Sequence, residues 1–212
     1  MSGALVEGWR LGGADLSDAV VIRPSGRPVA EGVRVLTELP EDEVPAVLML
    51  GMKPQTLDAV APSVAPVLEP ETILISILAG VELASLRQRF PTPRAIVRAM
   101  PNTPVRLNKG AIGLYTDTSD QATREGVATL MGALGDAEWI GDESLFDALS
   151  ALSASGPAFV FRFIEALAEG AAELALPRDV ARRLGVATVD GAGALPAASD
   201  EDPHQLAERV AS

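Results

Sequence analysis

Arg98-Ala-Met-Pro-Asn-Thr-Pro104 is the stretch whose residue types most directly suggest ligand binding. Two prolines stiffen its backbone, and the residues between them, Asn102 and Thr103, offer an amide and a hydroxyl for hydrogen bonding. An apolar run precedes the stretch, so we expect the loop to lie at the end of a buried strand. A rigid polar loop there could hold the ribose or carboxamide of a nicotinamide. The alternative is a purely structural turn.

A second polar stretch, Arg23-Pro-Ser-Gly-Arg27, also follows an apolar run. In a doubly wound nucleotide-binding fold, the end of the second strand meets the adenosine ribose. An acidic residue there accepts the 2′-hydroxyl of NAD, whereas an arginine suits the 2′-phosphate of NADP. Arg23, Ser25 and Arg27 therefore favour NADP, used as NADPH, with NAD still possible. The alternative is that these are ordinary charges of a solvated loop.

Lys53 and Pro54 follow a third apolar run, Ala46–Gly51. Parallel sheets bind their ligands at the carboxyl edge, where this pair is expected. Proline at position 54 ends ladder pairing and turns the chain. Lys53 could therefore face a bound phosphate, ribose or carboxylate.

Ser153-Ala-Ser-Gly-Pro-Ala-Phe159 precedes a long helical pattern. We expect Ser155 to cap a helix that begins near Pro157, because a serine oxygen satisfies free helix amides and proline is favoured in the first turn. Such a cap can be purely structural. If the helix N-terminus faces a cleft, its amides also attract a substrate carboxylate.

The composition limits the chemistry available to the chain. Seventeen basic and 29 acidic residues give a formal net charge of −12, which argues against a nucleic-acid-binding surface. The sequence has no cysteine and a single histidine, His204, so thiol chemistry is excluded and metal sites or histidine dyads are poorly supplied. No apolar run approaches the roughly 18 residues of a membrane span, and no secretion signal opens the chain. We expect a soluble, cytoplasmic protein that relies on a cofactor.

Short β-rich runs alternate with helical stretches up to Ile140, after which only helical patterns remain. This alternation predicts a doubly wound, Rossmann-type parallel sheet in a dinucleotide-binding domain, residues 1–141, followed by an all-helical domain, residues 142–212. The predicted strands are Ala19–Arg23, Val33–Leu36, Ala46–Gly51, Thr72–Ile77, Ala95–Met100 and Ala111–Tyr115. The predicted helices are Met1–Leu11, Pro54–Val67, Val81–Phe90, Ser119–Leu134, Ser144–Ala151, Pro157–Leu176, Arg178–Ala194 and His204–Ala211.

The chain opens on a helical pattern, Met1–Leu11. A doubly wound nucleotide fold normally opens with a strand and a glycine-rich turn whose amides hold the pyrophosphate. We therefore expect the first strand of the sheet to be missing. Small residues crowd the second part of the chain, which suits close helix packing either between subunits or within one core.

In their order and separation, these stretches resemble those of the pyrroline-5-carboxylate reductases, which catalyse the last step of proline biosynthesis. The family's VKPQ, RAMPNTP, LSGSGPAY and VTSPGGTT stretches match MKPQ (Met52–Gln55), RAMPNTP (Arg98–Pro104), LSASGPAF (Leu152–Phe159) and VAS (Val210–Ser212). The resemblance covers essentially the whole chain. It implies NAD(P)H-dependent reduction of 1-pyrroline-5-carboxylate to L-proline by hydride transfer to the cyclic imine, in a homodimer or dimer-based oligomer paired through helical domains. A dedicated catalytic side chain is not obligatory, since positioning and electrostatics carry most of the work.

The resemblance also assigns residues to the two sites. Those expected along the dinucleotide, in addition to Arg23 and Ser25, are Met52, Lys53, Pro54, Ala99, Met100, Asn102, Thr103 and Pro104. Those expected around the substrate are Ser153, Ser155, Gly156, Pro157, Asp200, Val210 and Ser212.

The chain departs from the family pattern at both ends and at one internal position. The family's opening strand and GxGNMG turn are missing, Ala154 stands where a glycine separates the two serines, and the chain stops before PGGTT. The resemblance therefore implies an incomplete helical domain and parts missing from both sites. Finding neither a VxGxGN-like stretch upstream nor PGGTT downstream in the encoding DNA would remove the enzyme assignment. Separately, we expect little or no activity from the chain as given.

Two other functions stay open at this point. One is reduction of another imine or of a β-hydroxy acid; hydroxy-acid enzymes usually rely on a lysine in the helical domain, and no lysine follows Lys109. The other is a non-catalytic relative that keeps only the pairing surface.

Overall fold

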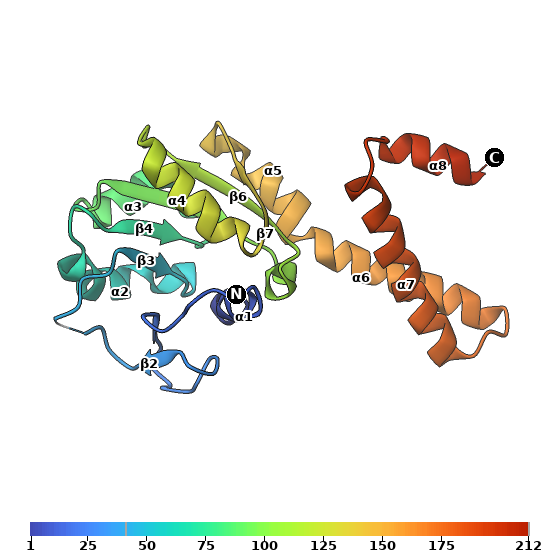
Figure 1. The fold of residues 1–212 in the computed structure, drawn as a ribbon, viewed down its shortest axis with the longest axis horizontal. Coiled ribbons are helices and arrows are strands. Elements are labelled where there is room, and N and C mark those ends of the chain that lie inside the picture. Colours follow the sequence, from blue (N-terminus) through green and yellow to red (C-terminus); the bar gives the residue numbers. More distant parts are fainter. Residues whose placement is uncertain (41, 212) are drawn as a thin grey trace. The chain divides into compact units, whose positions relative to one another are not determined.

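The computed structural model describes residues 1–40 and 42–211. The chain forms two compact units, Met1–Ser155 and Gly156–Ser212. The first unit is built of strands and helices, and the described part of the second consists of helices and the turns that connect them (Figure 1). The predicted α/β fold followed by a helical part is confirmed. The domain boundary near Gly141 stays a prediction, and the compact α/β unit continues to Ser155.

Five strands form the main sheet in the order β3-β4-β5-β6-β7. All neighbouring pairs are parallel except β5 and β6, which are antiparallel. A parallel connection needs a crossover of a dozen or so residues, and the chain between β5 and β6 is shorter than that, so it turns back beside β5. The predicted parallel sheet is confirmed for its larger part. The strands are β3 (Val47–Leu50), β4 (Ile73–Ser76), β5 (Ala95–Met100), β6 (Gly110–Thr116) and β7 (Gly135–Trp139).

Helices cover both faces of this sheet, as a doubly wound fold requires (Figure 1). One core joins the strands to α2 (Leu57–Val64) and α3 (Leu83–Arg89), and the other joins them to α1 (Ser2–Leu11) and α4 (Gln121–Gly132). Successive strand residues point to opposite faces, so a strand buried on both sides is mostly apolar on both. In β5, Ile96 faces the first core and Val97 the second, and neither is exposed. Each such side chain contributes about 1.5–3 kcal/mol to stability.

β7 has no counterpart among the strands predicted from the sequence. Its residues alternate between half-buried and exposed, with Asp136 and Glu138 on the exposed side. Only one face of this edge strand is covered, which leaves a short alternating pattern with two acids and no β-branched residue. Such a pattern carries little strand signal.

Two further predicted strands form a sheet of their own. β1 (Val20–Ile22) and β2 (Arg34–Leu36) pair in parallel, and among the described residues neither is bonded to the main sheet. The expectation that all predicted strands share one sheet is therefore wrong for these two. Pairing between a strand and its sheet depends on neighbours in space, which apolar runs do not specify.

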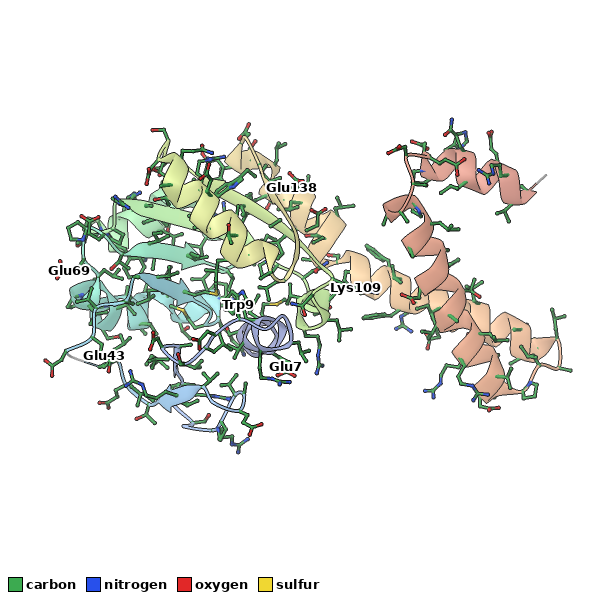
Figure 2. The ribbon with its side chains drawn as sticks, viewed as in Figure 1. Glu7, Trp9, Glu43, Glu69, Lys109 and Glu138 are labelled. Atoms are coloured by element: carbon green, nitrogen blue, oxygen red, sulfur yellow. The ribbon has the colours of Figure 1, made fainter. Side chains whose placement is uncertain are left out.

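The helix predicted over the first residues is confirmed as α1, which begins at Ser2. Leu5 is fully buried in the second core, and the Trp9 indole Nε1 donates to the Leu130 carbonyl of α4 at 2.8 Å. Glu7 lies on the outer side of α1, where it pairs with Arg10 at 2.8 Å (Figure 2). The apolar side of α1 thus completes one layer of the α/β unit.

The helical unit consists of α6 (Gly156–Glu173), α7 (Arg178–Ala197) and α8 (Pro203–Ala211). α6 and α7 approach closely at Gly185, where an added Cβ would lie 3.4 Å from the Ile164 carbonyl oxygen. The apolar surface left over is extensive: Phe159, Phe161 and Phe163 are 69%, 62% and 58% exposed. No residue of α6 is buried within this chain. The unit therefore presents an apolar face that its own helices do not cover.

One helical stretch, Glu143–Glu173, is long and apolar enough to cross a membrane by length and composition alone. It runs from the 3₁₀ turn η4 (Glu143–Leu145) through α5 (Phe146–Leu149) and the π-helical turn η5 (Ser150–Ala154) into α6. The Arg162–Glu165 ion pair, 2.6 Å, lies within it. Charged groups are costly in a hydrocarbon layer, so this evidence for a span is weak.

Replacing Gly8 with alanine tests the packing of α1. A Cβ at this position would lie 2.2 Å from the Val105 carbonyl oxygen and 2.7 Å from Leu134. We expect Gly8→Ala to lower the free energy of unfolding by about 1–3 kcal/mol, because overpacking forces the backbone to shift. Gly126→Ala is the matched control, since Gly126 in α4 meets no atom within 4 Å and alanine there should be neutral or stabilising. Urea unfolding measures both, and an unchanged midpoint for Gly8→Ala would contradict the packing.

Candidate nucleotide and substrate site

The carboxyl ends of β3, β4 and β5 lie along one edge of the main sheet, because these strands are parallel and adjacent. The first helix begins at this edge: the Ser2 hydroxyl donates to the Gly51 carbonyl just after β3, at 2.8 Å. A Cβ on Gly51 would lie 2.2 Å from that hydroxyl oxygen, so a larger residue there would displace the Ser2 side chain. A helix N-terminus at the carboxyl edge of a parallel sheet favours anions.

Lys53 follows β3 at this edge, as the sequence predicts, and its side chain is exposed. Its carbonyl accepts hydrogen bonds from the Thr56 amide at 2.9 Å and the Thr56 hydroxyl at 2.8 Å. Pro54 opens the short 3₁₀ helix η1 (Pro54–Thr56), which confirms the predicted turn of the chain. Met52 and Pro54 are half-buried beside it. The backbone is thus fixed while the lysine side chain reaches solvent.

The Arg23–Arg27 loop follows β1. Gly26 takes a φ of +60° and donates its amide to the Arg23 carbonyl at 3.0 Å, which closes a tight turn. The Arg23 guanidinium reaches the Arg27 carbonyl at 3.3 Å. Ser25 and Arg27 are exposed. Two arginines and a serine are thus grouped in one turn, an arrangement suited to a phosphate.

The predicted loop after β5 splits into buried and exposed members. Ala99 and Met100 are the last residues of β5 and are buried, whereas Thr103 is exposed and Pro104 half-buried at the start of η3 (Thr103–Leu107). Of the loop's side chains, the Thr103 hydroxyl therefore reaches solvent. The buried Ala99 and Met100 contribute backbone and shape.

Asn102 is buried, and the amide of its side chain bonds to the backbone at both ends. Its Nδ2 donates to the Ser153 carbonyl at 3.1 Å, and its Oδ1 accepts from the Ala111 amide at 3.0 Å. The sequence expectation that Asn102 faces the dinucleotide stays a prediction. Its two hydrogen bonds join it to the backbone of Ser153 and Ala111.

The expected helix cap at Ser155 is wrong. Ser155 has helical φ and ψ of −88° and −25°, and its amide donates to the Ser150 carbonyl at 3.1 Å, five residues back. The helix predicted to begin near Pro157 is confirmed as α6, which begins at Gly156. It directly follows a π-helical turn, so Ser155 has helical backbone angles and not those of a cap. Single π-helical turns are found frequently at functional sites.

Ser153 is buried and its hydroxyl donates to the Leu149 carbonyl at 3.0 Å. Ser155 is exposed, and Gly156 and Pro157, which begin α6, are half-buried. Of the two serine side chains, Ser155 is the one accessible to a ligand. The assignment of these residues to the substrate stays a prediction.

The remaining predicted substrate residues lie in the helical unit. Asp200 is exposed between α7 and α8, and Val210 is 90% exposed near the end of α8. Ser212 lies outside the described residues. Within this unit, neither Asp200 nor Val210 is packed into a core.

One ion pair near the site was not predicted from the sequence. The Arg98 guanidinium, 6% exposed, pairs with Glu143 Oε1 at 2.6 Å and lies 4.3 Å from the centre of the Phe146 ring. The same Glu143 oxygen accepts from the Leu83 amide, at the beginning of α3, at 2.6 Å. Arginine inside an otherwise apolar strand is the one signal for such a partner, but the sequence does not say which acid supplies it. Asp142, the residue before Glu143, caps the beginning of η4. Hydrogen bonds from Ser144 lower the pKa of its carboxyl group.

Comparison with known proteins shows which family the chain resembles. The family profile described as "Pyrroline-5-carboxylate reductase dimerisation" matches residues 143–212. The pyrroline-5-carboxylate reductase of Pseudomonas aeruginosa is 36% identical over 222 aligned positions, covering 100% of this chain and 80% of that protein. The chain belongs to the pyrroline-5-carboxylate reductase family. The enzyme of that name from Pisum sativum is 34% identical, over 89% of this chain and 70% of its own length.

A solved structure of a family member has the same fold. The pyrroline-5-carboxylate reductase of Coxiella burnetii superposes with a TM-score of 0.87 at 29% identity, covering 100% of this chain and 81% of that one. The resemblance stated from the sequence motifs is therefore confirmed. The family's dimerisation profile begins at Glu143, the residue that pairs with Arg98.

The Arg98–Glu143 pair should matter more to stability than an ion pair at the surface. Glu143→Gln removes the charge opposite a buried guanidinium, and we expect it to lower the free energy of unfolding by about 1–3 kcal/mol. Asp117→Asn is the control, because Asp117 pairs with Arg87 at 3.4 Å and its side chain is 50% exposed. That change should cost less than about 1 kcal/mol. Equal losses for the two variants in urea unfolding would show that the buried pair has no special weight.

Proposed function

We propose that the protein reduces 1-pyrroline-5-carboxylate to L-proline with a reduced nicotinamide dinucleotide, NADPH in preference to NADH. The observation that carries this proposal is the 36% identity to a pyrroline-5-carboxylate reductase across the whole chain. The geometry supports it, because the matched stretches lie at strand ends and at the π-helical turn, where the fold places polar groups. No similar support exists for a hydroxy-acid substrate.

The residues at the sheet edge fit a dinucleotide. The beginning of α1 at Ser2, beside the side-chain-free Gly51, suits the pyrophosphate, and the exposed Lys53 adds a positive charge at the same edge. Arg23, Ser25 and Arg27 would bind the 2′-phosphate. Thr103 would bind near the nicotinamide end, with Met52, Pro54, Ala99, Met100 and Pro104 shaping the surface.

The chemistry asks little of the protein's acids and bases. When bound, the reduced nicotinamide supplies a hydride. The electron pair of that hydride forms the new bond to the imine carbon, and the C=N π pair becomes a lone pair on nitrogen. A substrate that arrives with its nitrogen protonated therefore needs no acid from the protein. This agrees with a site of serine, glycine and proline, Ser155 to Pro157, whose task is to orient the imine.

Two copies of the chain would pair through their helical units. The family profile over residues 143–212 is that of a dimerisation region, and the helical unit leaves several phenylalanines exposed. A homodimer, or an oligomer built from it, would cover that apolar face. Asp200 and Val210, together with Ser212, would then belong to the substrate pocket. We place the enzyme in the cytoplasm, in agreement with a sequence that has no cysteine.

The reaction is tested by measuring proline directly. Purified protein is incubated for hours with NADPH and 1-pyrroline-5-carboxylate, and proline is quantified by mass spectrometry, which detects turnover far too slow for an absorbance assay. We expect proline only when both compounds and the protein are present. Because this assay detects even very slow turnover, protein that binds NADPH but forms no proline after hours of incubation would contradict the proposed substrate.

The coenzyme preference is tested at the Arg23–Arg27 turn. Each arginine that contacts the 2′-phosphate should contribute a charge-assisted hydrogen bond, so Arg27→Ala should raise the Kd for NADPH about tenfold and leave that for NADH nearly unchanged. Arg34→Ala on β2 is the control, because Arg34 is an exposed arginine already paired with Glu43. Fluorescence titration gives both constants. Equal weakening of NADPH and NADH binding by Arg27→Ala would rule out the 2′-phosphate contact.

A further inference from the structure

The backbone carbonyl of Ser153 has lost its usual helical partner. In an α-helix this carbonyl would accept from the amide four residues later, but residue 157 is proline and has no N–H. The segment also passes through a π-helical turn, in which the Ser155 amide donates to Ser150. Ser153 is buried, so water cannot readily replace the lost donor.

Asn102 supplies the donor that Pro157 lacks. Its Nδ2 donates to the Ser153 carbonyl at 3.1 Å, across 51 positions of sequence, in a contact buried from solvent. Its Oδ1 is held in turn by the Ala111 amide at 3.0 Å, which fixes the side chain to the beginning of β6. The chain thus has a rigid polar link from the main sheet to the serine segment, defined here as residues 150–155.

We propose that Asn102 is a positioning residue, whose side-chain amide holds the serine segment, and with it Ser155, in place for the reaction. This inference rests on the proposed reductase function. Asn102 acts through the Ser153 carbonyl and need not touch the coenzyme or the substrate. The loop after β5 then has two tasks: Thr103 faces outward, and Asn102 faces the chain itself.

Two variants separate the two ends of the amide. Asn102→Ala removes both hydrogen bonds, whereas Asn102→Asp keeps an acceptor for the Ala111 amide and loses the donor to Ser153. Thr116→Val is the matched control, because the buried Thr116 hydroxyl donates to the Ile96 carbonyl at 2.7 Å elsewhere in β6. That variant loses two side-chain-to-backbone hydrogen bonds, to the Ile96 carbonyl and from the Thr118 amide, but it leaves the serine segment untouched.

Hydrogen–deuterium exchange of the protein alone is the first measurement. We expect both Asn102 variants to exchange faster at the amides of residues 150–156, and the Thr116→Val protein to match the unmodified one there. Adding Pro157→Ala to Asn102→Ala supplies a helical N–H for the Ser153 carbonyl, so protection should partly return. Unchanged exchange of the serine segment in both Asn102 variants would overturn the proposal.

Kinetic measurements come second, and they distinguish a positioning role of Asn102 from a direct contact with the coenzyme. Misplacement of a reacting group by about 1 Å can cost up to 100-fold in rate, so kcat for proline formation should fall about 10- to 100-fold in both Asn102 variants. The Kd for NADPH should change less than about threefold, since the nucleotide contacts remain. A raised Kd with kcat restored at saturating NADPH would overturn the proposal and make Asn102 a coenzyme ligand. If the unmodified protein forms no proline, the proposed function fails, and the exchange data still decide whether Asn102 holds the serine segment.

Discussion

A buried guanidinium is the constraint from which much of the α/β unit follows. Arg98 sits in the central strand β5 at 5% exposure, and a charge so deep must be paired and hydrogen-bonded if the fold is to be stable. Glu143 provides the pair, Phe146 covers the guanidinium, and the Leu83 amide binds the same carboxylate. One charge therefore fixes three separate parts of the chain: the sheet, the beginning of α3 and the segment that leads into the helices.

The same stretch of sequence governs a second, uncharged constraint. Backbone polar groups that are buried must be satisfied, and the proline at position 157 withdraws one donor from the Ser153 carbonyl. The side-chain amide of Asn102 donates to this carbonyl in place of the missing N–H. Asn102 lies four positions after Arg98, in the loop that the sequence assigns to the coenzyme. A stretch matched by family resemblance thus combines residues that face a ligand with residues that organise the fold, and the sequence alone does not separate them.

The elements that could be predicted are those whose signal is local. β5 is predicted at its observed bounds because a strand buried on both faces is apolar except at Arg98, and α1 follows from helical spacing in its first residues. β7 is not predicted because only one of its faces is covered, which leaves a weak pattern. The separate β1-β2 sheet is not predicted because the sequence of a strand does not specify which strand it pairs with. The cap at Ser155 fails because a proline in a first turn looks the same whether a helix begins there or continues through a π-helical turn. The partner of Arg98 lies 45 residues away, beyond any local pattern.

The helical unit differs from the sheet in how much of its apolar surface is buried within the chain. A sheet with helices on both faces buries its apolar residues within one chain, whereas α6 exposes Phe159, Phe161 and Phe163 and has no buried residue of its own. Apolar surface on that scale is unfavourable in water, and a second copy of the same surface removes it for both partners at once. A helix that pairs between subunits needs apolar residues on more than one side, and the apolar composition of Glu143–Glu173 meets that need. The serine segment directly precedes α6 in the chain. Pairing of α6 with a second copy would therefore also restrain the C-terminal end of the segment, whose Ser153 carbonyl accepts from Asn102.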